Sequence, residues 1–572
     1  MNENNNMMNN TPPQGAVPPP QNGVPYGQAA YGPMPYNPYY QSPSYVKPIK
    51  EPIVFSKKEK IFAVAAAVLA YLFIQFVLWN ITGYFTTAFY FLILSCVTVY
   101  LNKSGFKFSA SHKFWDILMY IFSTVFSITA NTTIKTLNVI FLQLGTAYLI
   151  YSVTHESKLF GRFAVPEILK SSVADPMSHF DKEFSALGSS LKDTNSGKNI
   201  KSVLIGIIFA VPLTIVVAAL LASADAGIEK MFRSVFDSFN TQNIMSTVGK
   251  LIFTIPAAGY LFGLLYSQTH KDKTKQLTEE YCENSIKNAR KIPNAAMYVA
   301  VTPICLLYVL FFISQINYFF SAFRGILPEE YDYSQYARRG FFELFAIELI
   351  NAAVIFFINF FSQKTGEEKP AALKVYTLAI SVFTLLITAT AISKMAMYIS
   401  NCGLTQLRVY TTWFMVLTAI MFIYIIIRQF KRDFSVIRPA AATFILMFGL
   451  LCFSRPDAFI ARYNFENKSD VLSFRDVEIM SDMSLDSAAV VVSPEYADIV
   501  ERLYYEDNPN YRNYMYDREI YDPDDIDDEN KSSSDFVKER IRNKYHLNDY
   551  TSNKRVYNKF NLSYALISDK LD

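Results

Sequence analysis

The chain has 572 residues, of which 51% are hydrophobic, 16% are aromatic and only 18% are charged. An ordinary soluble domain carries about 25% charged residues, so the composition argues against a string of soluble domains and predicts an all-α protein that crosses a membrane many times. The net charge of +3 favours no class of partner. The five cysteines include no CxxC pair and the five histidines lie outside the apolar runs, so neither a metal site nor a cofactor is expected.

The N-terminal segment differs in composition from the rest of the chain. Its first 50 residues include 11 Pro, 8 Asn and 6 Tyr, with few aliphatic side chains. Such a segment cannot bury enough apolar surface to fold, and residues 1–55 are predicted to form a disordered cytoplasmic tail. Residues 1–50 act either as a docking arm for other proteins or as a solvated tether, and the composition favours the tether.

Eleven apolar runs follow within residues 56–454, which are predicted to form a transmembrane helical bundle. In lipid each run must be a helix, because only a helix satisfies its own backbone hydrogen bonds. A helix of about 18 residues rises about 27 Å, close to the thickness of a hydrocarbon core. The runs are at 61–79, 84–101, 115–130, 137–154, 203–223, 248–268, 295–321, 341–361, 375–393, 409–427 and 438–454.

The loop after the fifth run is amphipathic. Apolar residues recur at helical spacing from Ile228 to Phe239, and Glu229, Lys230 and Arg233 lie on the other face. This pattern predicts an amphipathic helix at 225–240 that lies in the outer interface of the membrane.

Lysine and arginine are distributed unevenly between alternate loops. With the N-terminus placed in the cytoplasm, the inner segments hold 28 Lys and Arg and the outer loops hold 8. Cytoplasmic loops of membrane proteins are enriched in these two residues. An odd number of spans then places the C-terminus outside the cytoplasm. The sequence therefore predicts a multi-pass protein of the plasma membrane with a cytoplasmic N-terminus and an extracytoplasmic C-terminus.

Residues 455–572 are predicted to form an acidic, mostly helical extracytoplasmic domain. They hold 16 Lys and Arg against 25 Asp and Glu, so no nucleic-acid surface is expected and a protein is the expected kind of partner. About 118 residues are enough to bury a small core. Helical patterns occur at 470–482, 494–505, 535–546 and 555–570.

The eighth run contains the strongest group of polar residues inside the predicted bundle. Glu343, Glu348 and Asn351 fall on one arc of a helix at about 100° per residue, and Arg339 lies four residues before Glu343. Lys394, in the next run, approaches from the same side and is the expected partner of Glu348. Ionisable groups in a span are usually paired or functional, so this site is either a structural clamp or a functional site.

Three stretches stand out next to the apolar runs. They are Tyr336-Ala-Arg338-Arg339-Gly340-Phe-Phe-Glu-Leu344, Arg455-Pro456-Asp457-Ala-Phe-Ile-Ala-Arg462-Tyr-Asn464-Phe465 and Phe560-Asn-Leu-Ser563. Together they resemble the bacterial membrane family called domain of unknown function 4173, a relative of the family numbered 4153. Arg455 stands where that family usually shows Asn, and Phe560 stands where it shows Trp. The resemblance implies a bacterial envelope protein and brings no known chemistry.

No motif in the sequence indicates an enzyme. GxxxxGK[ST], GxGxxG, HExxH and GxSxG are all absent. Two functions stay open. One is a non-enzymatic role in sensing, signalling or assembly at the cell envelope, with residues 455–572 as the part that meets partners. The alternative is a transporter or channel that uses the polar arc of the eighth run.

Overall fold

The computed structural model describes residues 55–79, 83–190, 214, 217, 241–270, 277–324, 341–363, 370–431, 433–507, 533–545, 547 and 561–571. Regular structure in this part of the chain is helical, as the composition predicts. The N-terminal tail up to residue 54, the expected span at 203–223, the expected interfacial helix at 225–240 and the motif residues Arg338, Arg339 and Gly340 lie outside the described residues.

Among the described residues, eight helices are long and apolar enough to cross a membrane, or nine if the bent pair α18–α19 is one span. Each coincides with a predicted run, and the predicted count of eleven is not reached within the described part of the chain. The helices are α1 (Lys57–Phe73, continued by a π turn at Ile74–Leu78), α2 (Tyr84–Lys103), α5 (Thr132–Thr154), α11 (Thr241–Thr269), α13 (Asn294–Arg324), α15 (Phe341–Phe361), α16 (Ala371–Cys402), α17 (Gln406–Phe430), α18 (Ile437–Phe453) and α19 (Pro456–Lys468).

The expected span at 115–130 is divided into two helices. These are α3 (Ala110–Ser123), which is too short to cross the membrane alone, and the single turn α4 (Val125–Ile128). Side chains of two other helices donate to carbonyl groups next to the break. Thr87 donates to the Ser123 carbonyl over 2.8 Å, and Asn138 donates to the Phe122 carbonyl over 2.9 Å. Neighbouring helices thus satisfy the broken backbone, which is the condition for an interruption inside a membrane.

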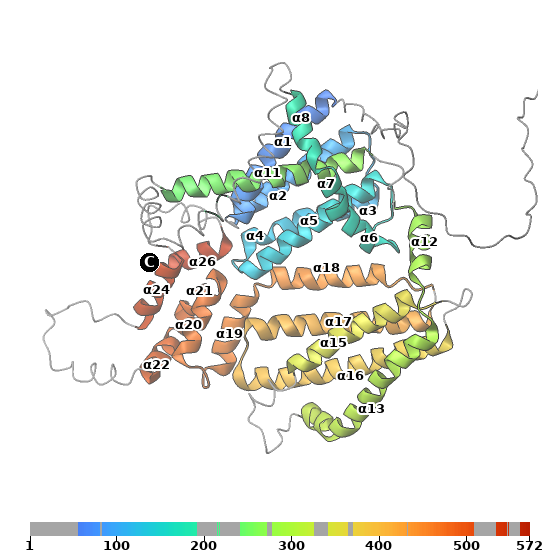
Figure 1. Ribbon diagram of the computed structural model, residues 1–572. Coiled ribbons are helices and arrows are strands. Elements are labelled where there is room, and N and C mark those ends of the chain that lie inside the picture. Colours follow the sequence, from blue (N-terminus) through green and yellow to red (C-terminus); the bar gives the residue numbers. More distant parts are fainter. Residues whose placement is uncertain are drawn as a thin grey trace, which may run out of the picture. The chain divides into compact units, whose positions relative to one another are not determined.

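The membrane helices pack in two groups. The first core gathers side chains of α2, α3, α4, α5 and α11, and α1 packs along α11. In the second, α16 contacts α13, α15 and α17. Helix α18 contacts α17 on one side and α4 and α5 on the other (Figure 1). Phe122 of α3 stacks on Phe448 of α18 with ring centroids 5.8 Å apart, so α18 joins the two groups.

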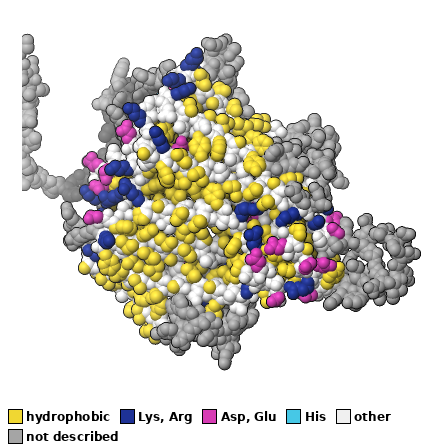
Figure 2. All heavy atoms as spheres, turned by 180° about the vertical axis from the view of Figure 1, so that it is seen from behind, with side chains coloured by type: hydrophobic (Ala, Val, Ile, Leu, Met, Phe, Trp, Pro, Cys, Tyr) yellow, Lys and Arg dark blue, Asp and Glu magenta, His cyan; other side chains and the backbone are white. Residues whose placement is uncertain are grey.

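The outer faces of these helices are apolar. On α13, Leu306, Leu310 and Ile313 recur at helical spacing and are 60%, 62% and 65% exposed. Figure 2 shows a broad hydrophobic band over the helices, with charged side chains gathered at its edges. A soluble protein rarely exposes so large an apolar surface, and lipid is the solvent that this surface fits. The protein is therefore a multi-pass helical membrane protein.

The C-terminal part forms a small helical domain with its own core. Its largest buried side chains include Phe465, Phe474 and Tyr496, and both Ile541 of α24 and Ile567 of α26 join them. Each of the four expected helical patterns contains a helix. The helices after α19 are α20 (Phe474–Met483), α21 (Leu485–Val491), α22 (Ala497–Asp507, preceded by a 3-10 turn at Pro494–Tyr496), α24 (Ser533–Lys544) and α26 (Leu562–Leu571).

Four short helices lie in the loops between the membrane helices. Helices α7 (Asp175–Ser178) and α8 (Phe180–Ser190) pack on α11, α6 (Ala164–Leu169) contacts α5, and α12 (Glu279–Ala289) contacts α15. Helix α8 packs on α1 and α11 and buries Glu183 completely. Neither carboxyl oxygen of Glu183 has a hydrogen-bond partner in the described part of the chain. Burial raises the pKa of Glu183 from 4.5 to about 9, so the side chain is neutral at pH 7.

Replacing Glu183 with Gln is expected to stabilise the protein more as the pH rises. Between pH 4.5 and about 9 the unfolded chain loses the proton of Glu183 and the folded chain keeps it, so a rising pH favours unfolding. Glu183→Gln removes this penalty and should add at least about 1 kcal/mol at pH 8. The measurement is thermal unfolding in detergent from pH 5 to 8. Asp181→Asn on the same helix is the control, and an equal gain in both variants would contradict the assignment.

Candidate functional site

A seam of polar side chains runs between α15 and α16 inside the apolar bundle. Asn351, predicted as part of the polar site, is fully buried on α15. Its Oδ1 accepts a hydrogen bond from the Tyr308 hydroxyl on α13, and its Nδ2 donates to Thr384 Oγ1 on α16 over 2.9 Å. Further along α15, Asn359 Nδ2 donates to Thr377 Oγ1 over 3.2 Å. Since each amide meets a hydroxyl group of a neighbouring helix, the seam holds α13, α15 and α16 together in lipid.

Glu348 lies in the same seam and is 2% exposed. The hydroxyl of Thr418 on α17 donates to its carboxyl group, and Thr388 on α16 is a second hydrogen-bonding partner. An ionisable group in a span costs about 2.5–3.5 kcal/mol on insertion scales, and hydroxyl partners lower that cost. A buried carboxyl group among hydroxyl groups can bind and release a proton, which is the chemistry that this seam offers.

The structure brings together only part of the predicted polar site. Glu348 and Asn351 share the seam, whereas Glu343 is exposed and Arg339 lies outside the described residues. Lys394 is half-buried on α16, six residues beyond Thr388. This spacing places it about 9 Å further along the helix axis. The hydroxyl groups at the level of Glu348 are the partners that the structure provides, and the pairing of Glu348 with Lys394 stays a prediction.

The hydroxyl half of the seam did not enter the predicted site. It consists of side chains on one face of α16, each also hydrogen-bonded to the carbonyl four residues earlier: Thr377, Ser381, Thr384 and Thr388. Their spacing of three or four residues is visible in the sequence. In a run of such high hydropathy, that spacing is the signal that marks the face turned toward other helices rather than toward lipid.

A second polar cluster lies where the C-terminal domain meets the membrane helices. Asp486, in the first turn of α21, is fully buried. One carboxylate oxygen accepts from Thr129 Oγ1 over 2.5 Å and from the Ala130 backbone N–H over 2.9 Å. The other accepts from the Arg455 guanidinium over 2.9 and 3.1 Å and from the Ser563 hydroxyl. We call these five residues the Asp486 hub, since one side chain joins four separate segments.

A second buried carboxylate, Asp457, extends the Asp486 hub. It accepts from Asn131 Nδ2 over 2.7 Å and from Gln406 Nε2 over 2.8 Å. Asn131 is also the N-cap of α5, where its Oδ1 accepts from the Ile134 N–H over 2.9 Å. Gln406 is the first residue of α17. Asp457 therefore connects the starts of two membrane helices to α19.

Two cations balance the two buried carboxylates. Arg455 contacts Asp486 directly, and Lys135, one turn into α5 and 6% exposed, is electrostatically coupled to the same carboxylate. Buried charges are costly unless they are paired and hydrogen-bonded, so removing any one partner leaves the others uncompensated. All of these contacts can therefore form together in only one arrangement of the C-terminal domain on the bundle.

Asn464 fixes the loop between α16 and α17 to α19. Its Oδ1 accepts from the Leu404 N–H over 2.7 Å, and its Nδ2 donates to the Leu404 carbonyl over 2.9 Å. The preceding Gly403 has φ +73° and ψ −172°, a conformation that is essentially restricted to glycine. A Cβ atom at Gly403 would lie 2.6 Å from Asn464 Oδ1. Glycine is therefore required here by both the backbone and the contact.

Two of the motif stretches noted in the sequence meet at this junction. Pro456 is the first residue of α19, and Arg455 before it has a φ of 50°. At the C-terminal stretch, Asn561 Nδ2 donates to the Thr129 carbonyl over 3.2 Å. Arg462 is exposed and takes no part in the Asp486 hub.

Sequence reasoning missed the centre of this cluster. Asp486 reads as an ordinary acidic residue in the first turn of a helix, and Asn131 reads as an ordinary cap. Only the fold brings these two residues together, because they are more than 350 positions apart. Among the described residues, no group of three or more His, Cys, Asp or Glu is placed to hold a metal ion.

Comparison with known proteins adds one match. The model of the family described as Domain of unknown function (DUF4153) matches residues 116–493, about two thirds of the chain. The matched range contains Asn131, Asp457 and Asp486, as well as the seam of α15 and α16. It ends before the Phe560-Asn-Leu-Ser563 stretch. No curated protein and no solved structure matches the chain.

Proposed function

The chain belongs to the family described as Domain of unknown function (DUF4153), and from this premise we propose that it is a non-enzymatic protein of the bacterial cell envelope that acts in sensing, signalling or assembly. Within the family, we propose that it groups with the relatives numbered 4173, which the three motif stretches resemble. The C-terminal domain lies outside the cytoplasm and meets the partner, and the membrane bundle receives the signal. The excess of Lys and Arg in the inner segments supports this orientation.

The Asp486 hub is the observation that carries this proposal. A domain that only needed anchoring would be joined by an exposed linker. Here a buried carboxylate network connects the domain to the starts of α5 and α17. A partner that shifts the domain must break these hydrogen bonds, and it thereby frees Asn131, the N-cap residue of α5, from Asp457. Movement outside the membrane is in this way coupled to two membrane helices.

Orientation is tested with single cysteines in a variant without the five native cysteines. A probe at Glu495, which is exposed in the C-terminal domain, should react with a membrane-impermeant maleimide in intact cells. A probe at Ser42 in the N-terminal tail should react only after permeabilisation. Reaction of both probes in intact cells would contradict the orientation.

The function is tested by complementing a deletion strain. Asp486→Asn is expected to abolish complementation, because the C-terminal domain then loses its coupling to the bundle. Expression level and membrane insertion are measured in parallel, so that a low abundance of the variant is not mistaken for a loss of its function. Full complementation by Asp486→Asn at normal abundance would overturn the proposal.

A transporter or channel is the second candidate, and the observation that favours it is the buried carboxyl group of Glu348 in the seam. Glu348→Gln keeps the shape of the side chain and an oxygen that accepts from Thr418. We therefore expect its thermal stability in detergent to change by no more than about 1 kcal/mol. If this stable variant fails to complement the deletion while Asp486→Asn succeeds, the transporter is favoured. The opposite pattern supports the sensing, signalling or assembly role.

A further inference from the structure

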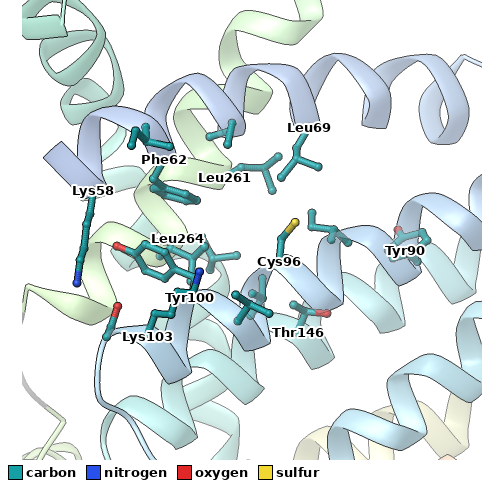
Figure 3. Close-up of a pocket in the computed structure, with 18 of the residues that line it drawn as sticks. Lys58, Phe62, Leu69, Tyr90, Cys96, Tyr100, Lys103, Thr146, Leu261 and Leu264 are labelled. Carbon is teal, nitrogen blue, oxygen red and sulfur yellow. The ribbon is translucent and has the colours of Figure 1, made fainter.

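A pocket of about 450 Å³ lies between α1, α2 and α11 (Figure 3). Its walls are mostly apolar and include Phe62, Leu69, Ile93 and Leu264. Two further lining residues, Ile61 and Val99, are 63% and 51% exposed on the outer surface of the bundle. The pocket is therefore open toward the bilayer, and an apolar chain can enter it from the side without crossing water.

Two lysines lie at one end of this pocket. Lys58 is the second residue of α1 and Lys103 is the last residue of α2, and Figure 3 shows both side chains at the same end of the space between the helices. In the described part of the chain, neither lysine forms a salt bridge with a carboxylate. The end of the pocket is therefore positively charged while its interior is apolar.

The depth of the pocket fits one leaflet of a bilayer. Leu69 lies eleven residues after Lys58 on α1, which corresponds to about 17 Å along the helix. Tyr90 lines the deep end, thirteen residues before Lys103 on α2. Half of a hydrocarbon core is about 15 Å thick, so an acyl chain that starts at the lysines ends near the floor of the pocket.

We propose that this pocket binds one acyl chain of an anionic phospholipid, with the lipid phosphate between Lys58 and Lys103. The charge of the two lysines selects an anionic headgroup, and the opening at Ile61 and Val99 admits the tail. In the proposed orientation the lysines lie at the cytoplasmic side, so the lipid belongs to the inner leaflet. The site is separate from the seam and from the Asp486 hub, and only its assignment to the inner leaflet rests on the proposed orientation.

The test uses the full-length protein and native mass spectrometry, with titration of phosphatidylglycerol and of phosphatidylcholine with the same acyl chains. The wild type is expected to retain one phosphatidylglycerol at least tenfold more tightly than phosphatidylcholine. Lys58→Gln with Lys103→Gln should reduce this preference to twofold or less. The matched control, Lys57→Gln with Lys107→Gln, removes the same charge from exposed lysines outside the pocket and should keep it.

The tail is tested separately from the headgroup. Ala65 lines the pocket, and Ala65→Trp should fill it and weaken binding of both lipids at least tenfold. Val64→Trp, on the exposed face of the same helix, should change binding by less than twofold. Glycerol 3-phosphate at millimolar concentration should not displace the lipid, since it has no tail. Displacement by glycerol 3-phosphate would show a free-phosphate site and would overturn the proposal, as would equal weakening by the two Trp variants.

The deep end offers one more discriminating variant. The Tyr90 hydroxyl is buried and has no hydrogen-bond partner among the described residues. An acyl tail needs no polar partner there, so Tyr90→Phe should leave the affinity for phosphatidylglycerol unchanged within twofold. A tenfold loss would mean that the ligand carries a polar group at this depth, and an ordinary phospholipid would then be the wrong ligand.

Discussion

Replacing Asp486 with Ala is expected to destabilise the protein by about 3–5 kcal/mol, the usual cost of removing one partner from a buried ion pair. The substitution leaves Arg455 without its carboxylate, and it leaves the Thr129 hydroxyl and the Ala130 N–H without their acceptor. The measurement is the fraction of protein that stays monodisperse in detergent after heating.

Asp482→Ala is the matched control for this prediction. Asp482 lies in the same domain and pairs with Arg540 and Lys544, but it is about one third exposed. Exposed ion pairs contribute about 0–1 kcal/mol, so its loss should be small. Equal destabilisation by the two substitutions would show that the Asp486 hub contributes no more to stability than a partly exposed ion pair.

Replacing Gly403 with Ala should also cost several kcal/mol. The backbone conformation of Gly403 accounts for about 1–3 kcal/mol, and the clash of the new Cβ with Asn464 Oδ1 adds to it. Relief of the clash should make the double variant with Asn464→Ala less destabilised than the sum of the two single variants. Thermal unfolding of the three variants measures this coupling, for which about 0.5–3 kcal/mol is typical of residues in contact.

Gly105→Ala separates the two causes. Gly105 also has a positive φ, of 90°, but a Cβ there meets nothing within 4 Å. It should therefore show only the cost of the backbone conformation. If Gly403→Ala is no worse than Gly105→Ala, then the contact with Asn464 does not hold the loop between α16 and α17 in place.

The membrane helices could be predicted because their signal is local. A run of about 18 apolar residues is sufficient evidence for a span, whatever the rest of the chain does. The division of the run at 115–130 could not be predicted in the same way. It depends on Thr87 and Asn138, two side chains of other helices that donate hydrogen bonds to the backbone carbonyls at the break. High hydropathy alone does not show whether such partners are present.

The polar sites were predictable to different degrees. Glu348 and Asn351 stand out because polar residues are rare in an apolar run, and both are buried in the seam. Asp457 and Asn464 were noticed only through the resemblance to a family. Asp486 gives no sequence signal, because its importance comes from four segments that meet in space. The periodicity and spacing of residues along the chain cannot show which distant segments meet in the folded protein.

The central claim is that the C-terminal domain and the membrane bundle are coupled through the Asp486 hub. Hydrogen–deuterium exchange of the full-length wild type, Asp486→Asn and Asp482→Asn tests it most directly. The account predicts that Asp486→Asn accelerates exchange by at least tenfold in the C-terminal domain and also in the first turns of α5 and α17, while Asp482→Asn does not. Faster exchange confined to α21 and its neighbours, with α5 and α17 unchanged, would contradict the claim.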